Sequence, residues 1–126
     1  MSNWQQVQSA LPLIDAHQVQ QMEQQLGAEV VARLLSLFSQ EGELQSSLLQ
    51  QAVMAGKYEE VAQICHSLKA ASGSYGALRC QYLSEKLEVA CRQQQLESIE
   101  VLASAWLQAW DETLGIINGP SSLIGK

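Results

Sequence analysis

The sequence predicts an all-α protein, folded as an antiparallel up-and-down four-helix bundle with an additional short N-terminal helix. Almost every segment of the 126 residues carries apolar side chains at helical spacing, and none is a convincing strand. The turns between these segments are short, and short connections place successive amphipathic helices antiparallel. Hydrophobic residues make up 47% of the chain, which is enough for one buried core.

Turn and capping residues set the expected bounds of each helix. Pro12 closes the first, short helix, Asp15 is a typical N-cap for the second, and Gly27 ends it. We expect one domain over 1–126, with its core over about 13–115 and a loose tail over 118–126. The predicted helices run over residues 3–11, 15–27, 28–55, 58–75, 78–94 and 96–114.

Apolar side chains identify the expected core. The three tryptophans, Trp4, Trp106 and Trp110, are interpreted as packing residues of the core and bundle end rather than as a ligand-binding box. The apolar set of the long helix is Val30, Val31, Leu34, Leu35, Leu37, Phe38, Leu44, Leu48, Leu49 and Ala52.

Composition excludes several classes of function. The chain has 7 Lys and Arg against 13 Asp and Glu, a net charge of −6 and a pI near 4.7. This charge repels a phosphate backbone, so we expect no nucleic-acid binding. No apolar run is long enough to span a membrane, and Met1 is not followed by a signal sequence, so we expect a soluble, cytoplasmic protein.

The cysteines give no sign of a metal site. Cys65, Cys80 and Cys91 are odd in number, and their spacing matches no close-paired zinc pattern. Each lies in an apolar helical segment, which predicts buried, reduced thiols. The two histidines, His17 and His66, are far apart in the sequence, so no metal ligation is expected.

The segment from Cys65 to Ala77 carries the chemistry of the chain. On a helix, His66 falls almost opposite the apolar stripe, so its imidazole is predicted to face solvent. Lys69 lies one turn further on and supplies a mobile positive charge suited to a phosphoryl oxygen. The predicted buried stripe is Val61, Ile64, Cys65, Leu68, Ser72 and Tyr75, and the residues predicted to share the face of His66 are Ala62, Lys69, Ala70 and Gly73.

Small residues around His66 predict a docking surface. Ala62, Ala70 and Gly73 leave the ring nitrogen within reach of another protein, and a glycine inside a helix costs about 1 kcal/mol relative to alanine. No nucleophile–base pair, phosphate loop or paired catalytic carboxylates accompany the histidine. The residues therefore favour a histidine that takes a group from one protein and gives it to another.

The same residues resemble the histidine phosphotransfer (HPt) domain, whose signature is roughly H-x-L-K-G-x-[SA]-x-x-x-G-[AL]. The similarity extends over about residues 13–115. The sequence departs from the signature at Ala70, because the family usually has Gly directly after the lysine. We expect the methyl group of Ala70 to reduce the fit of a partner protein without abolishing transfer. The matching positions are His66, Leu68, Lys69, Ser72, Gly76 and Ala77.

The resemblance implies a carrier in a multistep two-component phosphorelay, not an enzyme. His66 would accept a phosphoryl group from the aspartate of a receiver domain and pass it to a second receiver. Its partners would be response-regulator receivers and a hybrid sensor histidine kinase, and the Mg²⁺ would belong to the receiver, so the chain needs no cofactor. Lys69 would offset phosphoryl charge. The resemblance also implies a monomer.

Residues on the next helix complete the implied site. Glu88 would accept the Nδ1 proton of His66, and Arg92 would join an electropositive rim. Alternatively, Glu88 is a surface charge paired with Arg92 at i,i+4. Gly76 is expected to be a structural helix C-cap, and Gly73 either a close-packing or a docking residue.

Two other classes of function remain open on the sequence. One is a helical docking module that binds a receiver or kinase without being phosphorylated. The other is an enzyme, such as a phosphohistidine-dependent phosphatase or a kinase fragment. The solvent-facing position predicted for His66 argues against the first, and the absence of a nucleotide loop argues against the second.

Overall fold

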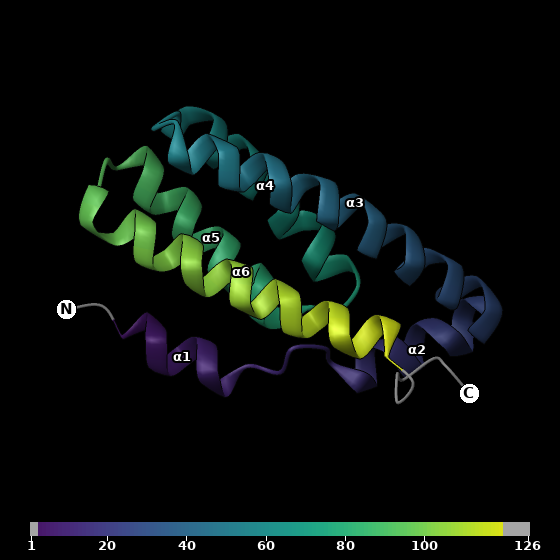
Figure 1. Ribbon diagram of the computed structural model, residues 1–126. Helices are drawn as coiled ribbons and strands as arrows, with labels where there is room; N and C mark the ends of the chain where they lie inside the picture. The colour runs from purple at the N-terminus through teal and green to yellow at the C-terminus, as the bar shows by residue number, and fades with distance from the viewer. Residues whose placement is uncertain (1–2, 120–126) are drawn as a thin grey trace.

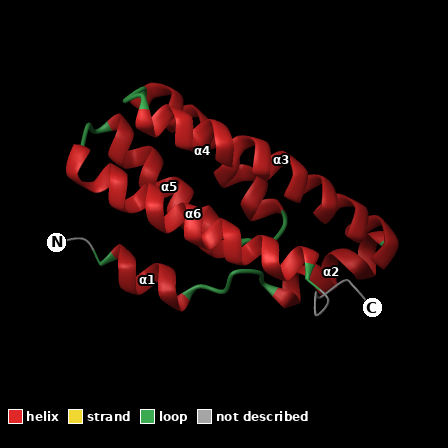
Figure 2. Ribbon diagram, viewed as in Figure 1, coloured by secondary structure: helices red, strands yellow, loops and turns green. Residues whose placement is uncertain are grey.

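The computed structural model describes residues 3–119, and within them the fold is all-α with no strand (Figure 2). This confirms the predicted fold class. No helix in the described part of the chain is long and apolar enough to cross a membrane. The helices are α1 (Trp4–Ala10), α2 (Ala16–Leu26), α3 (Ala28–Met54), α4 (Tyr58–Ser74), α5 (Leu78–Arg92) and α6 (Leu96–Asn118).

Helices α3 to α6 form the four-helix bundle (Figure 1). Each packs against the next in the chain, and α6 closes the bundle against α3. Helix α1 lies alongside the bundle and packs on α5, while α2 packs on α3. Two of the six predicted helical segments, now α1 and α2, therefore lie outside the bundle, whereas the predicted fold class named one additional short helix. Gly27, whose φ is 90°, turns the chain sharply between α2 and α3, as predicted.

Helix ends are set by the residues that the sequence singled out. The Asp15 carboxylate accepts a hydrogen bond from the backbone N–H of His17 at 3.1 Å, which caps α2. Gly76 has a φ of 76°, and this lets the N–H of Ala77 close back on the carbonyl of Ser72 at 2.9 Å. Both predictions are confirmed, and Gly76 is structural.

The C-terminal boundary differs from the prediction. Helix α6 runs through Asn118, whereas the sequence placed its end near 114 and began a loose tail at 118. Asn118 is therefore helical, and its side chain donates to the Ser39 hydroxyl at 3.3 Å. The rest of the predicted tail, from 120 on, lies outside the described residues.

Aromatic side chains organise the core. Trp106 is fully buried, stacks on Trp110 with ring centroids 5.7 Å apart, and donates its indole N–H to the Ser84 hydroxyl at 2.8 Å. Phe38 meets Trp110 edge-on at 5.3 Å. With Trp4 also buried, the prediction that the tryptophans are packing residues is confirmed.

Part of the predicted core of α3 is exposed. Leu37, Leu44 and Leu48 are 59%, 57% and 43% exposed, so their assignment to the buried set is wrong. Helix α3 carries leucines around more of its circumference than α2, α4 and α6 cover. Helical periodicity alone does not say how wide an arc the neighbouring helices will bury.

The three cysteines are buried and free, as predicted. Burial raises the pKa of each thiol, to about 11 for Cys80 and Cys91. All three side chains are therefore neutral near pH 7, and they act as small apolar groups of the core.

Candidate functional site

His66 projects from the middle of α4, with 66% of its side chain exposed. The residues predicted to form the opposite, buried stripe include Val61, Cys65 and Leu68, and all three are buried. The solvent-facing position predicted for His66 is confirmed.

Ala62 does not share this exposed face. It is completely buried, so the prediction that it helps to line a docking surface is wrong. Helix α4 packs against both α3 and α5, and its buried arc is therefore wider than a single apolar stripe.

Gly73 and Ala70 differ in their surroundings. Ala70 is exposed, whereas Gly73 is half-buried. A Cβ at Gly73 would lie 2.5 Å from the side-chain amide nitrogen of Gln81 on α5, and the Gly73 carbonyl accepts from the Gln18 amide of α2 at 2.9 Å. The missing side chain thus accommodates Gln81, and Gly73 serves packing between helices. A docking role for Ala70 stays a prediction.

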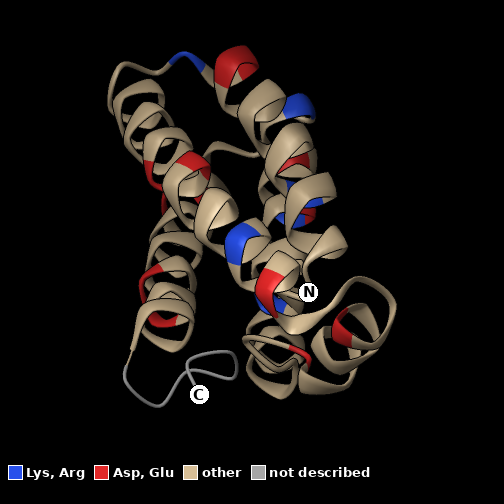
Figure 3. Cartoon of the chain, turned by 90° about the vertical axis from the view of Figure 1, so that its right-hand side faces the viewer, with Lys and Arg blue, Asp and Glu red and all other residues tan. Residues whose placement is uncertain are grey.

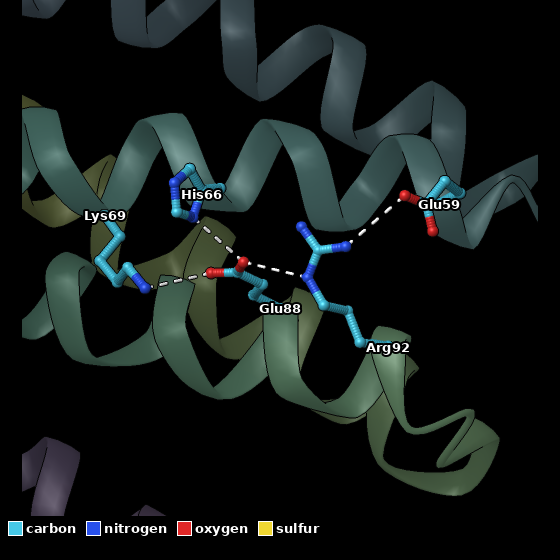
Figure 4. A network of polar contacts seen from close by, with 5 residues as sticks. All are labelled: Glu59, His66, Lys69, Glu88 and Arg92. Carbon is cyan, nitrogen blue, oxygen red and sulfur yellow. Dashed lines mark hydrogen bonds and ion pairs between the residues drawn. The ribbon is translucent and has the colours of Figure 1, made fainter.

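Glu88 joins the residues that the sequence proposed for the site (Figure 4). It lies on α5, 22 residues beyond His66, with only 10% of its side chain exposed. Its Oε2 accepts from Nδ1 of His66 at 3.1 Å and from Nε of Arg92 at 3.1 Å. Its Oε1 lies 3.2 Å from Nζ of Lys69. One buried carboxylate therefore holds the imidazole and two cations.

This arrangement decides between the two interpretations of Glu88. The i,i+4 ion pair with Arg92 exists, but Glu88 is buried and is shared with His66 and Lys69. An isolated surface pair would leave the carboxylate in water. Glu88 is instead the centre of the contacts between α4 and α5 at this point.

Glu88 fixes the tautomer of His66. Burial raises the pKa of the Glu88 carboxyl, but the cations of Lys69 and Arg92 and the hydrogen bond from His66 outweigh that effect and hold the pKa below its ordinary value. The group is therefore a carboxylate at neutral pH and can only accept. Nδ1 of neutral His66 must then carry the proton, and Nε2 keeps its lone pair. No described residue hydrogen-bonds to Nε2.

Glu59 is a member of the network that the sequence reasoning missed. Its Oε2 lies 3.5 Å from Nη1 of Arg92, across the gap between α4 and α5. The side chain is 73% exposed. The available signal was its position two helical turns before His66, which puts both on one face of α4. Its pairing with Arg92 depends on how α5 packs, and no spacing within the sequence shows that.

Positive charge near His66 stands out against the acidic whole. The net charge is −6, yet Lys69 and Arg92 both contact the Glu88 carboxylate, which also accepts the hydrogen bond from the His66 imidazole. Figure 3 shows Lys and Arg positions interspersed with Asp and Glu along the helices rather than gathered in one basic patch. Among residues 3–119, no group of three or more His, Cys, Asp or Glu is placed to hold a metal ion.

The charge of Glu88 predicts a pH-dependent contribution to stability. Because the folded-state pKa is lowered, the contribution is present above the ordinary value of 4.5 and is lost as pH falls through the folded-state value. We expect Glu88→Gln to be destabilised relative to wild type at pH 7, and the difference to shrink on acidification. Urea unfolding at pH 7 and pH 3 measures it. Glu85→Gln, at an exposed position of α5, is the control, and a difference that stays constant with pH would contradict the ionised network.

Comparison with known proteins agrees with this geometry. A family model described as the Hpt domain matches residues 33–115, from the first turns of α3 into α6. The match covers more than half of the chain, and the chain belongs to the Hpt domain family. No curated protein and no solved structure in the comparisons matched it. Hpt domains carry out histidine phosphotransfer in two-component signalling, with receiver domains and kinases as partners.

Proposed function

We propose that this protein is the intermediate carrier of a multistep phosphorelay, and that Nε2 of His66 is the atom that carries the phosphoryl group. The observation on which this rests is the hydrogen bond from Nδ1 of His66 to the buried Glu88 carboxylate. It leaves the other ring nitrogen with a free lone pair on an exposed side chain. An accessible, correctly protonated imidazole is what a nucleophile toward a bulky protein phosphodonor requires.

The transfer balances without moving a proton. The Nε2 lone pair attacks the phosphorus of the receiver's aspartyl phosphate, the P–O bond to the aspartate breaks, and the aspartate leaves as a carboxylate. The ring keeps its Nδ1 proton and becomes a positively charged phosphoimidazolium, whose charge the Glu88 carboxylate faces. In the onward step a second receiver's aspartate attacks, and the Nε2–P electron pair returns to the ring.

Lys69 is the cation for the phosphoryl oxygens. It lies one turn beyond His66 on the same helix, its side chain is 31% exposed, and its ammonium contacts the same Glu88 carboxylate that holds the ring. We assign the Mg²⁺ of the in-line transfer to the receiver, and the carrier contributes His66, Lys69 and Glu88 alone. A cytoplasmic monomer that serves a hybrid sensor kinase and response regulators completes the proposal.

The first test is transfer to the wild-type protein. A panel of receiver domains, each prephosphorylated with acetyl phosphate and Mg²⁺, is mixed with the protein, and phosphate-affinity electrophoresis follows the label. We expect a shifted band whose label is lost in mild acid and kept in mild base, as for a phosphohistidine.

Each other result points to a different class of protein. No label from any receiver, with the helical fold intact, would favour the docking module that binds without being phosphorylated. Label taken from ATP in the absence of any kinase or receiver would show an enzyme and contradict the carrier.

A further inference from the structure

The two cations around Glu88 are held differently. Lys69 lies 3.2 Å from Oε1, but Oε1 accepts no hydrogen bond of good geometry, so this contact is a loose ion pair. Arg92 donates from Nε to Oε2 at 3.1 Å and pairs through Nη1 with Glu59 at 3.5 Å. The Arg92 guanidinium thus has two carboxylate partners, Glu88 and Glu59, whereas the Lys69 ammonium has one, Glu88 (Figure 4).

This difference matters once His66 is loaded. A phosphoryl group on Nε2 brings new negative charge beside Lys69, whose flexible stem lets the ammonium turn from Glu88 to the phosphoryl oxygens. Glu88 then loses one of its two cationic side chains while buried, and weaker pairing of a buried carboxylate is costly. Besides the phosphoimidazolium ring, Arg92 is then the remaining cationic side chain on Glu88 among the described residues, and its stabilising effect depends on its staying in place.

We propose that Glu59 is a positioning residue, which holds Arg92 against Glu88 so that Glu88 stays fixed on Nδ1 of His66 when Lys69 turns to the phosphoryl group. The inference rests on the proposed function for its purpose, but the contact itself exists in the unloaded protein. Glu59 touches neither the imidazole nor the reacting atoms; it acts through the guanidinium that bridges α4 and α5.

The direction in which the Glu88 pKa shifts when Glu59 is replaced distinguishes this positioning role from a general charge effect. Among the described residues, the groups that face Glu88 are Cys65, His66 and Lys69 on α4 and Arg92 on α5. If Glu59 were only a nearby anion, its removal would lower the pKa of Glu88, because a like charge is lost. If Glu59 holds Arg92 in place, its removal frees the guanidinium and the Glu88 pKa rises.

The experiment follows the side-chain carboxyl carbon of Glu88 by ¹³C NMR titration of the unphosphorylated protein, so it needs no receiver. We expect Glu59→Gln to move the Glu88 pKa upward, in the same direction as Arg92→Gln and by less. The double variant Glu59→Gln/Arg92→Gln should titrate as Arg92→Gln alone. Glu60→Gln is the matched control, because Glu60 is the next residue of α4 but lies at the groove toward α3.

Three results would overturn the inference. They are a downward or absent shift in Glu59→Gln, an equal upward shift in Glu60→Gln, and a further shift when Glu59→Gln is added to Arg92→Gln. None of these results would contradict the proposed phosphotransfer, which is tested separately by phosphate label on the protein after reaction with a receiver. Thermal unfolding of each variant checks that the fold is kept, and the exposure of Glu59 makes a loss of fold unexpected.

Discussion

Replacing His66 by glutamine is expected to abolish phosphate acceptance completely. Glutamine keeps polar atoms at a comparable distance from the backbone but has no nucleophilic ring nitrogen. Because 66% of the His66 side chain is exposed, the change should alter the free energy of unfolding by no more than about 0.5 kcal/mol. The assay is transfer from a prephosphorylated receiver, scored by phosphate-affinity electrophoresis.

The other histidine supplies the matched control. His17 is exposed on the first turn of α2 and makes no side-chain contact with the site residues. We expect His17→Gln to be labelled at the wild-type rate. Residual acid-labile label on His66→Gln, lost only when His17 is also replaced, would show that the acceptor has been misassigned.

Replacing Glu88 by glutamine is expected to slow transfer by about 10- to 100-fold, by analogy with the loss when the partner that orients a metal-bound histidine is removed. The amide has no charge to oppose the phosphoimidazolium, and it can donate to Nδ1 as well as accept from it. Part of the protein then holds the wrong tautomer, with the proton on Nε2. Lys69 and Arg92 also lose the carboxylate that places them.

Single-turnover transfer kinetics at saturating receiver separate this effect from weaker docking. We expect the rate constant to fall while the receiver concentration at half-saturation changes little. Glu85→Gln, which removes the same charge one turn earlier on α5 at an exposed position, should leave the rate unchanged. A normal rate in Glu88→Gln would mean that the hydrogen bond to His66 has no part in the chemistry.

Local signals made much of the fold predictable. Asp15, Gly27 and Gly76 act within a few residues of themselves, through a side-chain cap or a positive φ, and their outcomes are confirmed. The arc of each helix that is buried is instead decided by neighbours. This is why Leu44 was placed in the core but is exposed, and why Ala62 was placed on the surface but is buried.

The same distinction holds for the site. His66 and Lys69 share one helix, so their relation follows from helical spacing. Glu88 was a candidate through family resemblance, with a surface ion pair as the competing interpretation, and only the packing of α5 on α4 places its carboxylate at Nδ1. Glu59 escaped attention because its partner, Arg92, belongs to the other helix. The pairing of site residues across α4 and α5 depends on how the two helices pack, and helical periodicity does not predict it.

The most direct test of phosphotransfer through His66 is to determine which atom holds the phosphoryl group. Protein labelled with ¹⁵N-histidine is phosphorylated by a receiver, and NMR detects the one-bond coupling between ³¹P and the ring nitrogen. We expect coupling to Nε2 of His66, with Nδ1 still protonated and hydrogen-bonded to Glu88. Coupling to Nδ1, to His17, or to no histidine in a protein that carries label would contradict this assignment.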